Sequence, residues 1–181
     1  MRQSRIKAIC RTAVMTATLS VLATISLPLP FTPIPLGLTN LAIMFMVVIF
    51  GPISTTIAVL VYIFLGIIGL PVFAGFNGGI GSLLGPTGGF IIGYIALCIA
   101  SGCLIEILSN RTKPFSVYIV SLTVGTWLLY AFGCTWYIII SKVSFGASIM
   151  ACVIPFVPLD MIKIVFVSII SVRYYYIKER R

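Results

Sequence analysis

Asp160 and Lys163 are the residues whose types and spacing best support chemistry in this sequence. They lie in the apolar stretch Pro155–Lys163, and a charged side chain within a membrane helix is unfavourable enough to be a functional candidate by default. The i, i+3 spacing places both on one helical face, where they can pair. An ion pair that only stabilises the helix bundle is the alternative. Pro155 and Pro158 favour a ligand site, because prolines bend helices and free carbonyl groups where a span lines a cavity.

Asn77 is the second candidate, and it lies in a glycine-rich segment at residues 71–89. The seven glycines of this segment allow the backbone to turn sharply and to approach a ligand closely. The Asn77 amide offers donors and an acceptor to a ligand, but Asn-Gly is also a strong turn dipeptide, so both roles stay open. Neither a Lys-Ser/Thr pair nor a βαβ unit accompanies the glycines, so a nucleotide site is not expected.

The composition excludes most catalytic and metal chemistry. The sequence has no histidine and only three acidic residues, Glu106, Asp160 and Glu179, so metal sites, catalytic triads and paired-carboxylate sites are not expected. The five cysteines lie singly in apolar stretches, and we interpret them as small core or lipid-facing residues. We predict that the chain is not an enzyme and that it uses no cofactor.

The elements that must position these residues are membrane helices. Of the 181 residues, 60% are hydrophobic and 8% charged, and the mean hydropathy is +1.21, whereas charged residues normally make up about a quarter of a soluble domain. A membrane crossing takes about 20 apolar residues. The sequence therefore predicts an all-α membrane protein, a single domain at residues 1–181, with spans at Ala8–Leu29, Leu38–Phe50, Ser54–Leu70, Gly88–Leu108, Phe115–Ile140 and Ile149–Tyr176.

Two connections are expected to do more than join helices. The three prolines at positions 30, 33 and 35 rule out a regular helix there. The span that follows is short for a full crossing, so we expect part of this connection to reach membrane depth, shielded by protein. The glycine-rich segment is apolar between its glycines, so we expect it to pack over the helix bundle.

The basic residues predict the orientation of the chain. With the N-terminus in the cytoplasm, ten of the twelve Lys and Arg residues fall on the cytoplasmic side, Lys142 lies outside, and Lys163 lies within the sixth span. By the positive-inside rule both termini are cytoplasmic, and the proline-rich and glycine-rich connections face outward. The charges flank apolar segments, so nucleic acid is not an expected partner. The ten cytoplasmic residues are Arg2, Arg5, Lys7, Arg11, Arg111, Lys113, Arg173, Lys178, Arg180 and Arg181.

Two further patterns stay open on spacing alone. Ala13 and Ala17 lie four residues apart on one face of the first span, a spacing that permits close helix packing within the chain or against a partner. Aromatic residues of the fifth span could supply an apolar wall for a ligand, although interfacial anchoring explains Trp136 and Tyr137 nearly as well; the five residues are Trp127, Tyr130, Phe132, Trp136 and Tyr137.

Nearly the whole chain resembles the BioY family, the biotin-specific substrate-binding (S) components of energy-coupling-factor (ECF) transporters. The most specific stretch is 66–75, continuing through Gly78-Gly79 to 83–90, and Pro155–Lys163 is similar to the PFxPxDxxK pattern of the family. Pro33-Ile34-Pro35 and Tyr130-Ala131-Phe132-Gly133 with Trp136 also fit. The sequence departs at Leu159, where relatives commonly have glycine, and near Thr39-Asn40, where they often have Gln-Thr.

The resemblance implies a six-helix protein of the cytoplasmic membrane that binds biotin from outside and works with a transmembrane coupling subunit and two cytoplasmic ATPases. Ala13 and Ala17 match the AxxxA motif thought to pack on the coupling subunit. Asn77, Gly78, Asp160 and Lys163 become the expected biotin contacts, with backbone N–H groups of the glycine-rich segment near the carboxylate. Whether Lys163 orients Asp160 or meets the ligand stays open. Another vitamin, such as thiamine or riboflavin, is the alternative ligand.

Overall fold

The computed structural model describes residues 2–30, 32–109 and 114–179. Four of the basic residues predicted to be cytoplasmic, Arg111, Lys113, Arg180 and Arg181, lie outside these residues. The elements, in chain order, are α1 (Arg2–Thr24), β1 (Ser26–Leu29), β2 (Thr32–Gly37), α2 (Thr39–Phe50), α3 (Pro52–Ile67), η1 (Ala74–Phe76), α4 (Ile80–Leu84), α5 (Gly88–Leu108), α6 (Pro114–Ser141), α7 (Phe145–Cys152) and α8 (Val157–Glu179).

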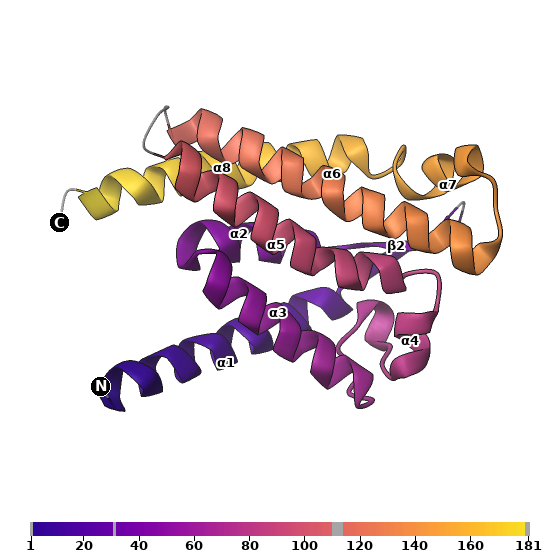
Figure 1. Ribbon diagram of the computed structural model, residues 1–181, viewed down its shortest axis with the longest axis horizontal. Coiled ribbons are helices and arrows are strands. Elements are labelled where there is room, and N and C mark those ends of the chain that lie inside the picture. Colours follow the sequence, from indigo (N-terminus) through magenta and orange to yellow (C-terminus); the bar gives the residue numbers. More distant parts are fainter. Residues whose placement is uncertain (1, 31, 110–113, 180–181) are drawn as a thin grey trace.

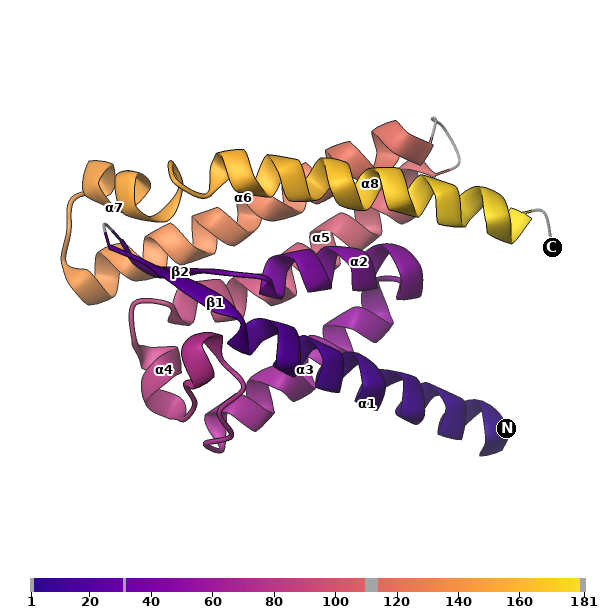
Figure 2. The same cartoon turned by 180° about the vertical axis from the view of Figure 1, so that it is seen from behind.

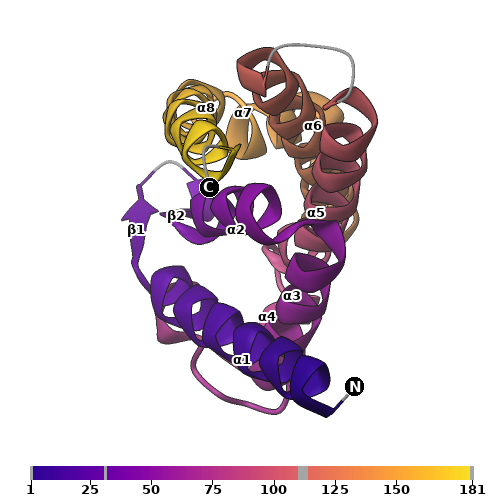
Figure 3. The same ribbon diagram turned by 90° about the vertical axis from the view of Figure 1, so that its left-hand side faces the viewer.

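The helices form an elongated bundle whose two ends differ. Both chain termini lie at one end, whereas α4 and α7 lie at the other (Figures 1 and 2). Viewed along the bundle, α2 occupies the middle (Figure 3), in contact with α1, α3, α5 and α8. Residues at the start of α2 are therefore close to several helices at once.

Helix length and composition identify the candidate membrane spans among the described residues. Residues 5–24 of α1 and the whole of α5 and α6 are long and apolar enough to cross a membrane, and α7 with α8 makes a fourth candidate if the bent pair counts as one span. Helices α2 and α3 are apolar but shorter. The 12 residues of α2 extend only about 18 Å at 1.5 Å per residue, so α2 is too short to cross alone, as its sequence predicts.

The first helix ends earlier than its sequence predicts, because the chain turns back into a hairpin. The helix stops at Thr24, and β1 pairs with β2 in an antiparallel two-stranded sheet, with Ser26 opposite Gly37. The expectation of a helix to Leu29 was wrong, and so was that of a purely α-helical fold. The two prolines of β2, Pro33 and Pro35, suit an extended strand at a sheet edge, since they cannot donate ladder hydrogen bonds.

The sixth predicted span consists of two helices rather than one. Helices α7 and α8 are separated by a turn at residues 153–156 and bent by 46°. The expectation of one helix from Ile149 was wrong, whereas the bend at the prolines is confirmed. Pro158 lies in the first turn of α8, where the backbone N–H groups have no partner within the helix and proline is tolerated. The break allows α8 to begin in the interior, with Asp160 in its first turn.

Small residues hold α5 and α6 close together along their length. A Cβ atom added to Gly125 would lie 2.0 Å from the Ser101 hydroxyl oxygen, and one added to Gly133 would lie 2.3 Å from the ring of Phe90. Close approach at small residues is the usual way in which membrane helices pack. The α5–α6 pair therefore forms a firm wall for the cavity beside it.

Candidate binding site

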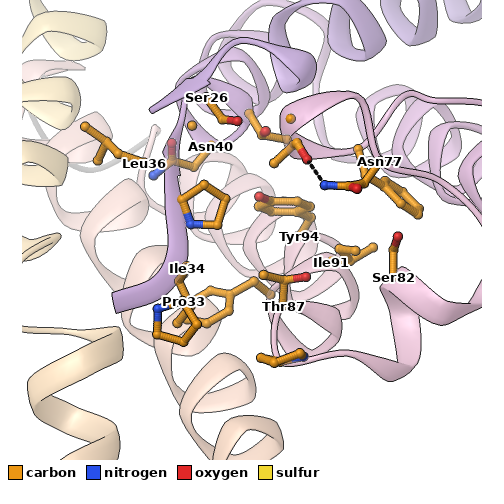
Figure 4. A pocket seen from close by; sticks show the side chains of 18 of the residues that line it. Ser26, Pro33, Ile34, Leu36, Asn40, Asn77, Ser82, Thr87, Ile91 and Tyr94 are labelled. Carbon is orange, nitrogen blue, oxygen red and sulfur yellow. Dashed lines mark hydrogen bonds between the residues drawn. The ribbon is translucent and has the colours of Figure 1, made fainter. Parts of the chain in front are cut away.

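A cavity of about 710 Å³ lies between the hairpin, the glycine-rich segment and the helices α2, α3, α5, α6 and α8. Figure 4 shows side chains from several elements converging on it. Most of its wall is apolar or aromatic, and the aromatic side chains are Tyr62, Phe73, Phe90, Tyr94, Tyr130 and Phe156. A cavity of this size with few polar groups is typical of a small-molecule site.

The Asp160 carboxylate is the centre of the polar part of the wall. Its side chain is only 2% exposed. One carboxylate oxygen, Oδ1, accepts from Asn40 Nδ2 at 2.7 Å and from Lys163 Nζ at 3.0 Å, and Oδ2 accepts from the Tyr130 hydroxyl at 2.6 Å. Its place in the first turn of α8 adds the favourable field of a helix N-terminus. These donors satisfy a buried charge that would otherwise be strongly destabilising.

Lys163 is committed to the protein rather than free for a ligand. Its ammonium group donates to Asp160 Oδ1 at 3.0 Å, to Asn40 Oδ1 at 3.0 Å and to the Gly37 carbonyl oxygen at 3.1 Å. An ammonium group has three N–H donors, so these acceptors use all of them. The pairing expected from the i, i+3 spacing is confirmed, and Lys163 also ties the end of β2 to α8.

Asn77 and Gly78 line the same cavity from the glycine-rich segment. The Asn77 side chain is exposed and donates to the Ala74 carbonyl oxygen at 2.7 Å, as Figure 4 shows. The Asn77 backbone carbonyl accepts from the Phe73 N–H at 2.9 Å. Asn77 thus stabilises a turn and faces the cavity, so the two roles that its sequence left open are compatible.

Packing restricts the glycine-rich segment at both of its ends. A Cβ atom on Gly78 would lie 2.4 Å from the Leu70 carbonyl oxygen. The buried Phe73 ring fills the space beside Gly66, and Trp136 of α6 donates through its indole N–H to the Gly85 carbonyl oxygen at 3.0 Å. The segment therefore packs against the bundle, as its apolar character predicts, and Trp136 anchors it.

All four residues predicted to bind substrate line the cavity, namely Asn77, Gly78, Asp160 and Lys163. Asn40 and Tyr130 line it as well, and neither was predicted to bind substrate through a polar group. Asn40 was noted only as a departure from the family pattern, yet it bonds to both charged groups. Tyr130 was one of five aromatic residues that could supply an apolar wall; it lines the cavity, and its hydroxyl group also donates to Asp160. An amide side chain directly before the apolar stretch 41–50 was the signal that could have found Asn40.

Ala13 and Ala17 lie apart from the cavity, on α1. Both side chains are exposed, whereas Met15, Thr16 and Leu19 between and beside them are buried. The Thr16 hydroxyl donates to the Ala58 carbonyl oxygen of α3 at 3.1 Å. The packing of α1 within the chain therefore uses another face than that of the two alanines.

Comparison of the sequence with those of known proteins identifies the family of this chain. The sequence matches the BioY family over residues 1–179. The chain belongs to the BioY family. A biotin transporter BioY of Thermotoga maritima is 34% identical over 168 residues, which cover 90% of this BioY chain and 92% of the relative. A biotin transporter BioY of Rhizobium etli is 32% identical over 148 residues, covering 79% of each chain. These relatives are transporters, in agreement with the expectation that the chain is not an enzyme.

Solved structures show the same fold for this BioY chain. The S component for biotin from an ECF-type ABC transporter superposes with a TM-score of 0.85 at 29% identity, covering 97% of this chain and 94% of the other. The S component of a bacterial ECF transporter superposes with a TM-score of 0.59 at 18% identity, covering 97% of both chains, and at this identity the likeness extends to the fold alone. This BioY protein is accordingly a membrane protein with several spans.

Proposed function

We propose that this BioY chain binds biotin in the cavity and serves as the S component of an ECF transporter. The observation that carries the proposal is the group of hydrogen-bonding side chains Asn40, Tyr130, Asp160 and Lys163, called here the polar corner. It lies in a cavity lined by the glycine-rich segment. Biotin has a polar cyclic urea at one end, an apolar thiophane ring, and a carboxylate on a flexible chain, and the cavity offers a matching sequence of surfaces.

The polar corner has hydrogen-bonding capacity left for the cyclic urea. A carboxylate has about four accepting positions, and the three donors to Asp160 leave one on Oδ2. The Tyr130 hydroxyl donates to Asp160, so its oxygen can still accept. Either acceptor suits an N–H group of the ring, and an unmatched ligand would leave these buried groups without partners.

We place the urea end of biotin at the polar corner and the carboxylate toward the glycine-rich segment. Lys163 has no N–H donor left for a ligand carboxylate, so its role is to orient Asp160 and Asn40. Asn77 and Gly78 then contact the ligand from the opposite side of the cavity, and backbone N–H groups of their segment are suited to the carboxylate. The rings of Tyr62 and Tyr94, which line the cavity, enclose the thiophane ring.

We further propose six membrane passes with both termini in the cytoplasm. The passes are α1, the hairpin with α2, α3, α5, α6, and the bent pair of α7 with α8. Both termini lie at the same end of the bundle (Figure 1), and the basic residues Arg5, Lys7 and Arg11 belong to the first turns of α1. The cavity then opens to the outside. A reporter that is active only in the cytoplasm, fused to the C-terminus, should be active, and an inactive fusion would refute this orientation.

The partners in the proposal are a transmembrane coupling subunit, which packs on Ala13 and Ala17, and two cytoplasmic ATPases. Two exposed alanines four residues apart offer a flat stripe to a partner helix. The chain itself would supply the substrate site, and the ATPases would supply the energy.

Saturable binding of labelled biotin by the purified protein tests the ligand. Unlabelled biotin should displace the label, whereas thiamine and riboflavin at the same concentration should not, because they lack a cyclic urea of the same size. Displacement by either vitamin, or the absence of saturable biotin binding in a folded preparation, would contradict the proposal.

A further inference from the structure

Asn40 occupies an unusual position in the polar corner. It is the second residue of α2, the helix in the middle of the bundle, and it lines the cavity with a partly buried side chain. Figure 4 shows it beside β2, across the cavity from Asn77. It is thus a neutral polar group within reach of both a ligand and the Asp160–Lys163 pair.

The hydrogen bonds of Asn40 define how its amide group is oriented. The side-chain oxygen accepts from Lys163 Nζ at 3.0 Å and from the Leu41 N–H at 3.0 Å. The side-chain nitrogen donates to Asp160 Oδ1 at 2.7 Å. A rotated amide would point its N–H groups at two donors, so the orientation is unambiguous. The second N–H of the amide has no partner within the described part of the chain.

We propose that this second N–H of Asn40 binds the carbonyl oxygen of the cyclic urea, and that Asn40 thereby sets the preference of the cavity for a ligand with an acceptor at that point. The inference rests on the proposed biotin function. In a cyclic urea each N–H lies beside the carbonyl group on the same edge of the ring. Asp160 presents an acceptor for the N–H, and Asn40, which is bonded to Asp160, presents the neighbouring donor.

A role in positioning alone is the competing explanation, because Asn40 also holds Asp160 and Lys163 in place. The two explanations differ in their effect on ligand preference. Loss of a positioning group weakens every ligand of the cavity by a similar factor. Loss of the donor to the carbonyl weakens only ligands that carry an acceptor there.

Iminobiotin separates the two explanations, since its ureido oxygen is replaced by a nitrogen group that is protonated at neutral pH and can only donate. Binding of biotin, desthiobiotin and iminobiotin is measured for the wild-type protein and for Asn40→Ala. The variant should lose affinity for biotin and desthiobiotin by about fivefold or more, the scale of one lost hydrogen bond. Its affinity for iminobiotin should stay the same or rise. This comparison works like a double-mutant cycle in which one change is made in the ligand and the other in the protein. It isolates the energy of the contact between Asn40 and the ureido oxygen.

The possible results distinguish failure of the proposed function from failure of the role proposed for Asn40. A wild-type protein that binds no biotin refutes the proposed function itself. A wild-type protein that binds biotin, together with a variant that loses affinity for all three ligands equally or for none, refutes the role of Asn40 as carbonyl donor. Retained binding of iminobiotin by Asn40→Ala also shows that the variant is folded.

A second measurement tests the proposal without the Asn40→Ala variant, in case that variant does not fold. The sequence has three asparagines, at positions 40, 77 and 110, so N77A/N110A protein carries asparagine only at position 40. With this protein labelled with ¹⁵N in asparagine and saturated with biotin labelled with ¹³C in the ureido carbonyl, solid-state NMR should show dipolar contact between the side-chain nitrogen and that carbon. Absence of contact in the saturated sample would overturn the proposal.

Discussion

The polar corner and the glycine-rich segment form opposite sides of one cavity, and they are built in different ways. The polar corner comes from α2, α6 and α8, which are distant in the sequence, and its side chains bond mostly to one another. The glycine-rich segment is continuous in the sequence, and its Asn77 side chain bonds to a carbonyl three residues away. Asp160 is 2% exposed, whereas Asn77 and Gly78 are exposed.

This difference assigns different tasks to the two sides. The groups that bond to the buried Asp160 carboxylate cannot readjust without leaving a charge or a donor unsatisfied, so the polar corner is suited to selecting a ligand. The exposed Asn77 side chain bonds to a carbonyl three residues away, so it can rearrange at little expense to the bundle while Trp136 holds Gly85 in place, which suits the entry and enclosure of a ligand. Removal of the Asp160 charge from the polar corner should therefore affect affinity more than substitutions in the glycine-rich segment.

The largest effect is expected for Asp160→Asn. The amide group has only one accepting oxygen, whereas the carboxylate accepts on both of its oxygens. Lys163 would also lose its counter-charge in a buried site, which lowers the free energy of unfolding by about 3–5 kcal/mol. Biotin affinity should fall more than a hundredfold, and the thermal unfolding temperature should fall as well. Isothermal titration and a thermal melt measure the two effects. Glu106→Gln, which neutralises an exposed acid on α5, is the control and should change neither.

Gly78→Ala should have the next largest effect, through the backbone. The added Cβ atom would lie 2.4 Å from the Leu70 carbonyl oxygen, so the segment must shift, at about 1–3 kcal/mol for an overpacked site. We expect biotin affinity to fall about tenfold in equilibrium binding. Gly146→Ala, where a Cβ atom would meet nothing within 4 Å, is the control. Equal affinity of Gly78→Ala and wild type would show that the segment does not need this conformation to bind.

A smaller effect is expected for Asn77→Ala. The change removes an exposed hydrogen bond to the Ala74 carbonyl oxygen and one ligand contact, together about 1 kcal/mol. Biotin affinity should fall about fivefold, mainly through faster dissociation, which stopped-flow fluorescence can follow. A loss as large as that of Asp160→Asn would refute the division of tasks between the two sides of the cavity.

The smallest effect on affinity is expected for the double substitution Ala13→Leu and Ala17→Leu. These exposed residues lie on α1, and the cavity-lining residues do not include them, so biotin binding should be unchanged within error. Uptake by the complete transporter should be lost, because the flat stripe for the coupling subunit is filled. Thr18→Leu, an exposed position on the same helix, should retain uptake. Uptake that survives the double substitution would exclude these alanines as the contact.

The sequence predicted well those features that depend on short-range chemistry. Hydropathy and proline positions predicted most of the helices, and the i, i+3 spacing of Asp160 and Lys163 predicted their ion pair, whose atoms lie 3.0 Å apart. The sequence predicted less well the positions at which the chain leaves a helix. Residues 25–29 are apolar enough to continue α1, and their pairing with β2 depends on a partner strand that composition alone does not reveal.

The sequence by itself determined the membrane class, the family, and four of the residues that line the cavity, namely Asn77, Gly78, Asp160 and Lys163. Those features follow from composition and from motifs within short stretches. Only the tertiary structure decided that Asn40 and Tyr130 complete the polar corner and that Lys163 has no donor left for a ligand. The reason is that Asn40 and Asp160 are 120 residues apart in the chain, and no local pattern reveals which distant side chain will satisfy a buried charge.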